Sequence, residues 1–82
     1  MTVNPIDVVT LGDTAIGDSA VVSGFVDGVV ARRFVEMGLV PGTRVTVLRV
    51  APLGDPIEYA VMGGRIAMRR SDAFAILVKE SV

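Results

Sequence analysis

The sequence contains no cysteine, no histidine and no tryptophan among its 82 residues. Without cysteine, the chain can form neither disulfide bonds nor thiolate zinc sites. Without histidine, it lacks the commonest general base near neutral pH and the commonest protein ligand for metals such as zinc. Serine–histidine and cysteine–histidine nucleophiles are therefore impossible, and no phosphate-binding glycine loop is present. These absences predict a protein that is not an enzyme.

Aromatic residues and an excess of basic charge are also missing. The chain has one tyrosine and three phenylalanines, and its 8 lysines and arginines face 9 aspartates and glutamates. Proteins that bind nucleic acid usually combine a basic patch with aromatic residues that stack on bases. Although small barrels often bind nucleic acids, this composition predicts no such partner.

Long hydrophobic runs are absent as well. A run such as 73–78 is too short to cross a bilayer, and the N-terminus lacks the basic and apolar regions of a signal peptide. We expect one domain over residues 1–82, which is cytoplasmic and reaches a membrane only through a partner. The apolar fraction is nonetheless 51%, which indicates a docking face, self-association as a homo-oligomer, or scattered exposed side chains.

Short apolar segments separated by glycine and proline are typical of a small all-β domain. Five strands are predicted, at 20–26, 44–50, 57–62, 65–69 and around 76–78. Residues alternate between two strand faces along 57–62 and 65–69 and at the start of 44–50. The alternation breaks between Val47 and Leu48, which predicts a bulge or bend, and Gly63-Gly64 predicts a tight hairpin. Single helical turns are expected over 5–10 and at 71–72. This pattern indicates a small barrel but does not distinguish an SH3-like barrel from an OB-fold.

One short helix is predicted between the first two strands, over residues 28–37. Asp27 is a suitable N-cap, and Val30, Phe34 and Met37 recur at the spacing of one helical face. We therefore expect this face to pack on the core. We also expect the core to contain the three phenylalanines and three methionines that suit gap-filling positions, Met37, Met62 and Met68.

The helix is followed by residues that favour a sharp change of direction. Gly38 stands where a left-handed residue ends a helix, and Leu39 can then fold back on the last turn. Pro41 and Gly42 occupy the central positions of a type II turn. Because glycine and proline are used here for their backbone angles, we interpret these four residues as a structural motif rather than a binding site.

Charged side chains offer few candidates for chemistry. Asp55 and Glu58 are the candidates for a divalent cation site or for acid–base work, but two carboxylates without a glycine-shaped loop do not make a dedicated site. We therefore expect no cofactor and no resident metal. The pairs Arg32-Arg33 and Arg69-Arg70, with Arg65 on the strand face of Arg69, form either a basic patch for an acidic partner or ordinary solvated surface.

Three segments resemble the FeoA family (ferrous iron transport protein A). Residues 33–42 resemble its helix-and-turn pattern, 51–57 its Ala-Pro-Leu-Gly-Asp-Pro signature and 65–70 its Leu-x-Leu-Arg segment. The resemblance covers nearly the whole chain in order, although Phe34 stands where leucine is usual. It implies a five-stranded SH3-like barrel with one inserted helix.

The same resemblance implies a cytoplasmic accessory or regulatory role in bacterial ferrous iron uptake. The implied partner is the membrane GTPase-permease FeoB, through its cytoplasmic GTPase domain. Similar domains end the metal-dependent repressors, so a stand-alone transition-metal-sensing domain is the alternative function. Our candidate partner-contact residues lie on the helix and around the long loop, and they are Arg32, Arg33, Leu53, Asp55 and Tyr59.

Overall fold

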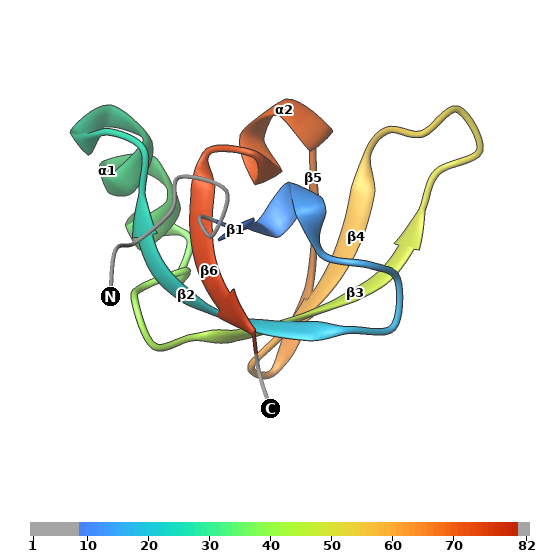
Figure 1. The fold of residues 1–82 in the computed structure, drawn as a ribbon, viewed down its shortest axis with the longest axis horizontal. Coiled ribbons are helices and arrows are strands. Elements are labelled where there is room, and N and C mark those ends of the chain that lie inside the picture. The colour runs from blue at the N-terminus through green and yellow to red at the C-terminus, as the bar shows by residue number, and fades with distance from the viewer. Residues whose placement is uncertain (1–8, 81–82) are drawn as a thin grey trace, which may run out of the picture.

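The computed structural model describes residues 9–80 of the chain. Within them, six strands and two short α-helices follow one another, with a 3₁₀ turn after the first strand (Figure 1). In chain order the elements are β1 (Val9–Thr10), η2 (Leu11–Asp13), β2 (Ser19–Phe25), α1 (Gly28–Glu36), β3 (Arg44–Val50), β4 (Ile57–Val61), β5 (Gly64–Met68), α2 (Arg70–Ala73) and β6 (Ile76–Glu80).

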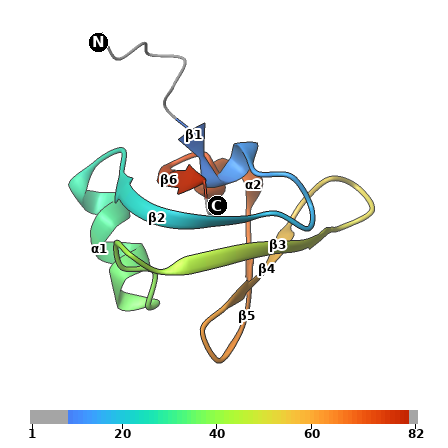
Figure 2. The ribbon, with the colours of Figure 1, turned by 60° about the horizontal axis from the view of Figure 1, so that its bottom comes forward.

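The strands form one antiparallel sheet in the order β1-β6-β2-β3-β4-β5. β2 and β3 lie side by side, and the β4–β5 hairpin crosses them steeply (Figure 2). The sheet thus curls into a small barrel. Its bending is helped by register shifts between Val22 and Gly24 and between Val47 and Arg49, because bulges increase the local twist. The second shift confirms the break in alternation predicted after Val47.

The barrel interior is filled by apolar side chains from every long strand and from both helices. Burial alternates along β2, β3 and β4, as expected for strands with one face on the core. The buried core consists of Leu11, Ala20, Val22, Phe34, Leu39, Val45, Val47, Ile57, Tyr59, Met68, Ala73, Ile76 and Val78. The predicted all-β fold with an inserted helix is therefore confirmed.

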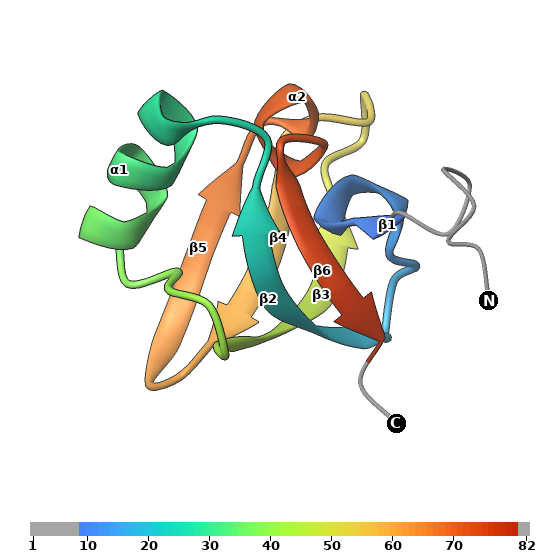
Figure 3. The same ribbon diagram turned by 60° about the vertical axis from the view of Figure 1, so that its left-hand side comes forward.

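Helix α1 lies outside the strands, at one side of the barrel (Figure 3). It begins at the predicted cap, where the Val30 N–H donates to Asp27 Oδ1 over 2.8 Å. Phe34 is its buried residue, and the Phe34 ring stacks on that of Phe25 with centroids 6.4 Å apart. The partly buried Val30 of the same helical face also packs against the core, so the helix is attached through Phe34 and Val30.

The junction between α1 and β3 has the geometry that its sequence predicts. The N–H groups of Gly38 and Leu39 donate to the carbonyls of Val35 and Phe34, which is a Schellman motif. Gly38 and Gly42 have φ angles of 95° and 96°, in the left-handed region that favours glycine. The structural interpretation of this motif therefore agrees with its geometry.

The five predicted strands are present, and the structure adds β1, which pairs with β6. The sequence predicted a helical turn over 5–10, but Val9 and Thr10 are extended, and 5–8 lie outside the described residues. The prediction was wrong for Val9 and Thr10 because a two-residue strand is too short to show alternation.

The β4–β5 hairpin turns at Met62 and Gly63 rather than at Gly63-Gly64. Gly64 already pairs with Val61, and Gly63 has a φ of 78°. Met62 is therefore the first residue of the turn and is 93% exposed. Its expected place in the core was wrong because the strand ends one residue earlier than its alternation suggested.

Two further residues expected in the core are partly exposed. Met37 is 47% exposed because the Schellman turn directs Leu39, rather than Met37, into the core. Phe74 is 44% exposed because it follows α2 and its ring packs over Gly12 at the surface. Met68, by contrast, is buried as predicted.

Candidate functional site

Three elements form a row along one edge of the molecule, namely α1, α2 and the β3–β4 loop of residues 51–56. Figure 1 shows α2 between the other two. Arg33 Nη2 of α1 lies 3.3 Å from Asp72 Oδ2 of α2, and Arg70 of α2 donates to the carbonyl of Gly54 in the loop. The predicted contact residues on α1 and on the loop thus share one edge but lie towards its two ends.

The β3–β4 loop is held in place by its own backbone and by α2. The Gly54 N–H donates to Ala51 O over 2.7 Å, and the Ala51 N–H donates to Pro56 O over 3.0 Å. Arg70 Nε and Nη2 both donate to Gly54 O, over 3.2 and 3.1 Å. Hydrogen bonds from a charged donor are stronger than neutral ones, so Arg70 is the main tertiary anchor of this loop.

Leu53 occupies the tip of this anchored loop and is 98% exposed. A large aliphatic side chain that is fully exposed on an ordered loop can enter a partner's pocket at little cost in conformational entropy. Asp55, two residues later, accepts a hydrogen bond from the Arg70 N–H over 2.8 Å. The Asp55 carboxylate thus caps α2, which accounts for it without a partner.

Tyr59 was expected at the contact surface, and this expectation was wrong. Its side chain is 0% exposed, because Tyr59 is on the core face of β4 between the buried Ile57 and the half-buried Val61. Burial raises the pKa of Tyr59 to about 12, while the positive charge of Arg70 lowers it and the negative charge of Asp55 raises it further. Among the described residues, its hydroxyl has no hydrogen-bond partner.

The two arginines of α1 differ in their surroundings. Arg33 is paired with Asp72, and its guanidinium carbon also lies 5.3 Å from the centroid of the Phe34 ring. Arg32 is exposed, and no ion pair is formed by it within residues 9–80. Arg33 therefore has a structural explanation, whereas Arg32 remains a candidate contact residue.

Asp55 and Glu58 are not brought together as one site. Glu58 lies between two arginines: its Oε2 is 3.4 Å from Arg49 Nη2, and its Oε1 is 3.4 Å from Arg65 Nη1. The Asp55 carboxylate instead accepts a hydrogen bond from the backbone N–H of Arg70. In the part of the chain that the structure describes, no group of three acidic, histidine or cysteine side chains could hold a metal ion.

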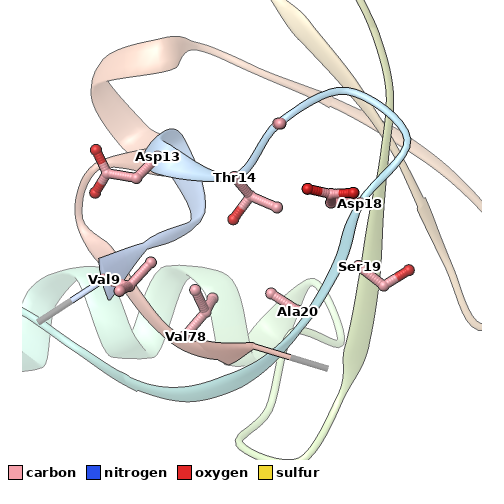
Figure 4. A pocket seen from close by; sticks show the side chains of 8 residues that line it. Val9, Asp13, Thr14, Asp18, Ser19, Ala20 and Val78 are labelled. Carbon is pink, nitrogen blue, oxygen red and sulfur yellow. The ribbon is translucent and has the colours of Figure 1, made fainter. Parts of the chain in front are cut away.

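The surface of residues 9–80 is hollowed in at least two places. The first, of about 350 Å³, lies beside η2, with Asp13, Thr14 and Asp18 along one side and Val9, Ala20 and Val78 along the other (Figure 4). Asp13 is already used, since it accepts hydrogen bonds from the N–H and the hydroxyl of Thr10. No predicted contact residue lines this hollow.

The second hollow, of about 510 Å³, lies at the base of the 51–56 loop. It is lined by side chains from β3, β4, β5 and the loop itself, namely Arg49, Val50, Ala51, Pro52, Pro56, Glu58 and Ala67. Sequence reasoning did not identify this hollow, because its walls come from segments that only the sheet register brings together. Glu58, one of the two candidates for a divalent cation site, is among the residues that line it.

The sequence did not indicate that Arg70 anchors the 51–56 loop through its hydrogen bonds to the Gly54 carbonyl. The sequence left Arg70 as part of either a basic patch or an ordinary solvated surface, whereas its guanidinium donates to a carbonyl that lies 16 positions earlier in the chain. No local pattern signals such a contact. The described geometry is that of a small barrel domain with an exposed and anchored loop.

The chain belongs to the FeoA domain family, whose model matches residues 9–80. It is 40% identical over 70 residues to the Fe(2+) transport protein A/Fe(2+) transporter FeoB fusion protein of Porphyromonas gingivalis (strain ATCC BAA-308 / W83). That match covers 84% of this chain but only 8% of the fusion protein. The resemblance to the FeoA family seen in the sequence is thereby confirmed.

Solved structures of FeoA proteins have the same fold. The FeoA protein from Chlorobium tepidum is 40% identical, with a TM-score of 0.81 over 90% of this chain and 71% of that one. FeoA of Stenotrophomonas maltophilia, an SH3 domain protein solved in complex with zinc, is 33% identical, with a TM-score of 0.74 over 87% of this chain and 89% of that one. The SH3-like alternative is therefore the correct one.

A manganese-dependent transcriptional repressor shares this fold. It is 22% identical, with a TM-score of 0.79 over 98% of this chain and 39% of the repressor. At this identity, the likeness concerns the fold alone. Separately, none of the helices in residues 9–80 is long and apolar enough to cross a membrane.

Proposed function

We propose that this chain is a cytoplasmic accessory protein of bacterial ferrous iron uptake, which regulates the membrane permease FeoB by binding its cytoplasmic GTPase domain. The observation that carries this proposal is the Porphyromonas gingivalis relative, in which transport protein A and FeoB form one polypeptide. Fusion places two domains at a high effective concentration, which is useful when they act on one another. A non-enzymatic role also agrees with the lack of histidine and cysteine.

The exposed loop provides the contact surface in this proposal. Leu53 is almost completely exposed, and the loop that carries it is fixed by Arg70. Interfaces usually depend on a few large side chains that become fully buried in the complex. Arg32 would contribute a charged contact at the other end of the same edge, while Arg33 and Asp55 support the surface by holding α2.

Titration of isotope-labelled protein with the purified GTPase domain, with and without nucleotide, tests the proposal by NMR. We expect amide shifts on the 51–56 loop and α2. Leu53→Asp should weaken binding by about tenfold or more, as for a central contact residue. Met62→Asp is the matched control, because Met62 is also a highly exposed apolar residue but lies on the β4–β5 hairpin, at the far end of the molecule. Equal loss in both variants, or no shifts in any nucleotide state, would count against this function.

Metal sensing is the second candidate function, and the zinc complex of the Stenotrophomonas maltophilia relative is the observation that favours it. Oxygen ligands such as Asp55 and Glu58 would have to supply the site, although each is engaged by an arginine. Isothermal calorimetry with Fe²⁺ under anaerobic conditions, and with Zn²⁺ and Mn²⁺, tests this function. Saturable binding at micromolar concentration that is lost in Asp55→Asn or Glu58→Gln would support it, and heats of dilution alone would reject it.

A further inference from the structure

The hollow at the base of the 51–56 loop combines apolar walls with a charged edge. Val50, Pro52, Pro56 and Ala67 provide aliphatic surface, and Arg49 lies at the edge with its side chain 74% exposed. A hollow of about 510 Å³ can hold one aliphatic side chain and its neighbouring backbone. An apolar hollow with one or two polar groups at its edge is the usual form of a small binding site.

Arg49 and Glu58, which line the hollow, carry opposite charges, and Arg65 adds a second positive charge beside Glu58. Arg49 stands opposite Glu58 in the β3–β4 register, and Arg49 Nη2 lies 3.4 Å from Glu58 Oε2. Arg65 Nη1 lies 3.4 Å from the other oxygen of the same carboxylate. Since two guanidinium groups share a single carboxylate, the arrangement can accept a second carboxylate beside Arg49.

We propose that this hollow binds a short protein segment in which an aliphatic side chain stands next to an aspartate or glutamate. The aliphatic side chain packs between Pro52, Pro56 and Ala67, and the carboxylate pairs with Arg49. This inference concerns the chemistry of the bound segment and is independent of the proposed function, because it does not specify the protein that carries the segment.

A second copy of this chain is a poorer occupant. Leu53 of a second copy offers an exposed aliphatic side chain, but the nearby carboxylate of Asp55 is already bonded to the Arg70 N–H, and the Gly54 carbonyl to the Arg70 guanidinium. That loop would have to leave its anchor in order to pair with Arg49. The Leu53 loop of a second copy thus offers no free carboxylate, and we take the bound segment to come from another protein.

NMR titration of the labelled full chain with the peptide acetyl-Gly-Leu-Asp-Gly-amide tests the proposal. We expect amide shifts at Val50, Ala51 and Ala67, with a dissociation constant on the order of 1 mM for so short a peptide. Acetyl-Gly-Leu-Asn-Gly-amide, which lacks the carboxylate, should bind about threefold more weakly, as expected for one exposed ion pair. Acetyl-Gly-Gly-Asp-Gly-amide, which lacks the aliphatic side chain, should cause no saturable shifts.

Variants of the protein test the same contacts from the other side. Arg49→Gln should weaken the leucine–aspartate peptide about threefold, while Arg44→Gln, an exposed arginine at the other end of β3, should not change its binding. Ala67→Leu fills the hollow and should abolish the shifts, with the remaining spectrum unchanged. Equal binding of the aspartate and asparagine peptides, shifts centred elsewhere, or shifts at these residues that depend on protein concentration without peptide would each overturn the proposal.

Discussion

The two connections that flank β3 use their leucines in opposite ways. The α1–β3 junction of residues 37–43 is held by backbone hydrogen bonds, both between near neighbours and to Val22 of β2, and it sends Leu39 into the core. The β3–β4 loop of residues 51–56 is held by its own backbone and by the side chain of Arg70, and it presents Leu53 to solvent. One connection is a piece of the structural frame, and the other is a surface held ready for contact. A similar content of glycine, proline and leucine therefore serves packing in one place and exposure in the other.

Replacing the leucine in each connection should give the largest difference between them. Leu39→Ala should lower the free energy of unfolding by about 3 kcal/mol, because it removes buried methyl groups and leaves a cavity. Leu53→Ala should change it by less than about 0.5 kcal/mol, since the side chain is already in water. Urea denaturation followed by circular dichroism measures both. A similar loss in the two variants would mean that Leu53 packs against another surface, such as a second copy.

The next largest effect should be the loss of stability at alkaline pH, which depends on the buried Tyr59. The pKa of Tyr59 is raised from 10.0 to about 12 in the folded state, chiefly by burial. The neutral Tyr59 therefore contributes fully to the free energy of unfolding below pH 10. As the pH rises from 10 towards 12, the free energy of unfolding should fall by roughly 2–3 kcal/mol in total.

Tyr59 is the only tyrosine of the chain, and there is no tryptophan, so phenolate absorbance reports on it directly. We expect ionisation to be delayed and to coincide with unfolding. Tyr59→Phe should be at least as stable at neutral pH, because it removes an unpaired buried hydroxyl, and should resist alkaline unfolding better. Titration near pH 10 with the fold intact would contradict the burial of this side chain.

Removing the anchor of the β3–β4 loop should have an intermediate effect. Arg70→Ala loses both hydrogen bonds to Gly54 O and should cost about 1–2 kcal/mol, with faster motion of residues 51–56 in NMR relaxation. Arg69→Ala is the matched control, because Arg69 is an exposed neighbour of the same type. If both variants relax and unfold alike, the loop does not depend on the Arg70 side chain and is held by its own turn and by the bond from the backbone N–H of residue 70 to Asp55.

The smallest expected effect concerns the backbone of the other connection. Gly38→Ala should cost about 1 kcal/mol, because alanine is strained at a φ of 95° although nothing crowds the position. Gly28→Ala, where φ is ordinary and space is open at the first position of α1, should be neutral or slightly stabilising. Thermal unfolding of the two variants is a sufficient measurement. A loss confined to Gly28→Ala would reverse our interpretation of the junction.

Most of the fold was predictable because its signals are local. β3 was predicted with its bounds and its bulge, and α1 with its cap at Asp27 and its end at Gly38. β1 was not predictable, since Val9 and Thr10 are extended only because β6 pairs with them.

The candidate site was predictable only in part. Leu53 could be identified because the turn residues around it place it at the tip of a loop, and its exposure agrees with this. Tyr59 could not be placed, since alternation along β4 sorts residues into two faces without saying that the hydroxyl is enclosed. The hollow at the base of the loop was invisible because Arg49, Glu58 and Ala67 come from three strands.

The amino-acid sequence alone was enough for the family, for strands β2 to β6 and for the turn at 37–43, because caps, glycine angles and alternation depend on residues a few positions apart. Folding in three dimensions was needed to bring Arg70 to Gly54, to enclose Tyr59 and to place the Phe74 ring 2.8 Å from where a side chain on Gly12 would begin. These contacts join segments that are distant in the chain. Which segments come into contact depends on the curvature of the sheet, and no single stretch of sequence specifies that curvature.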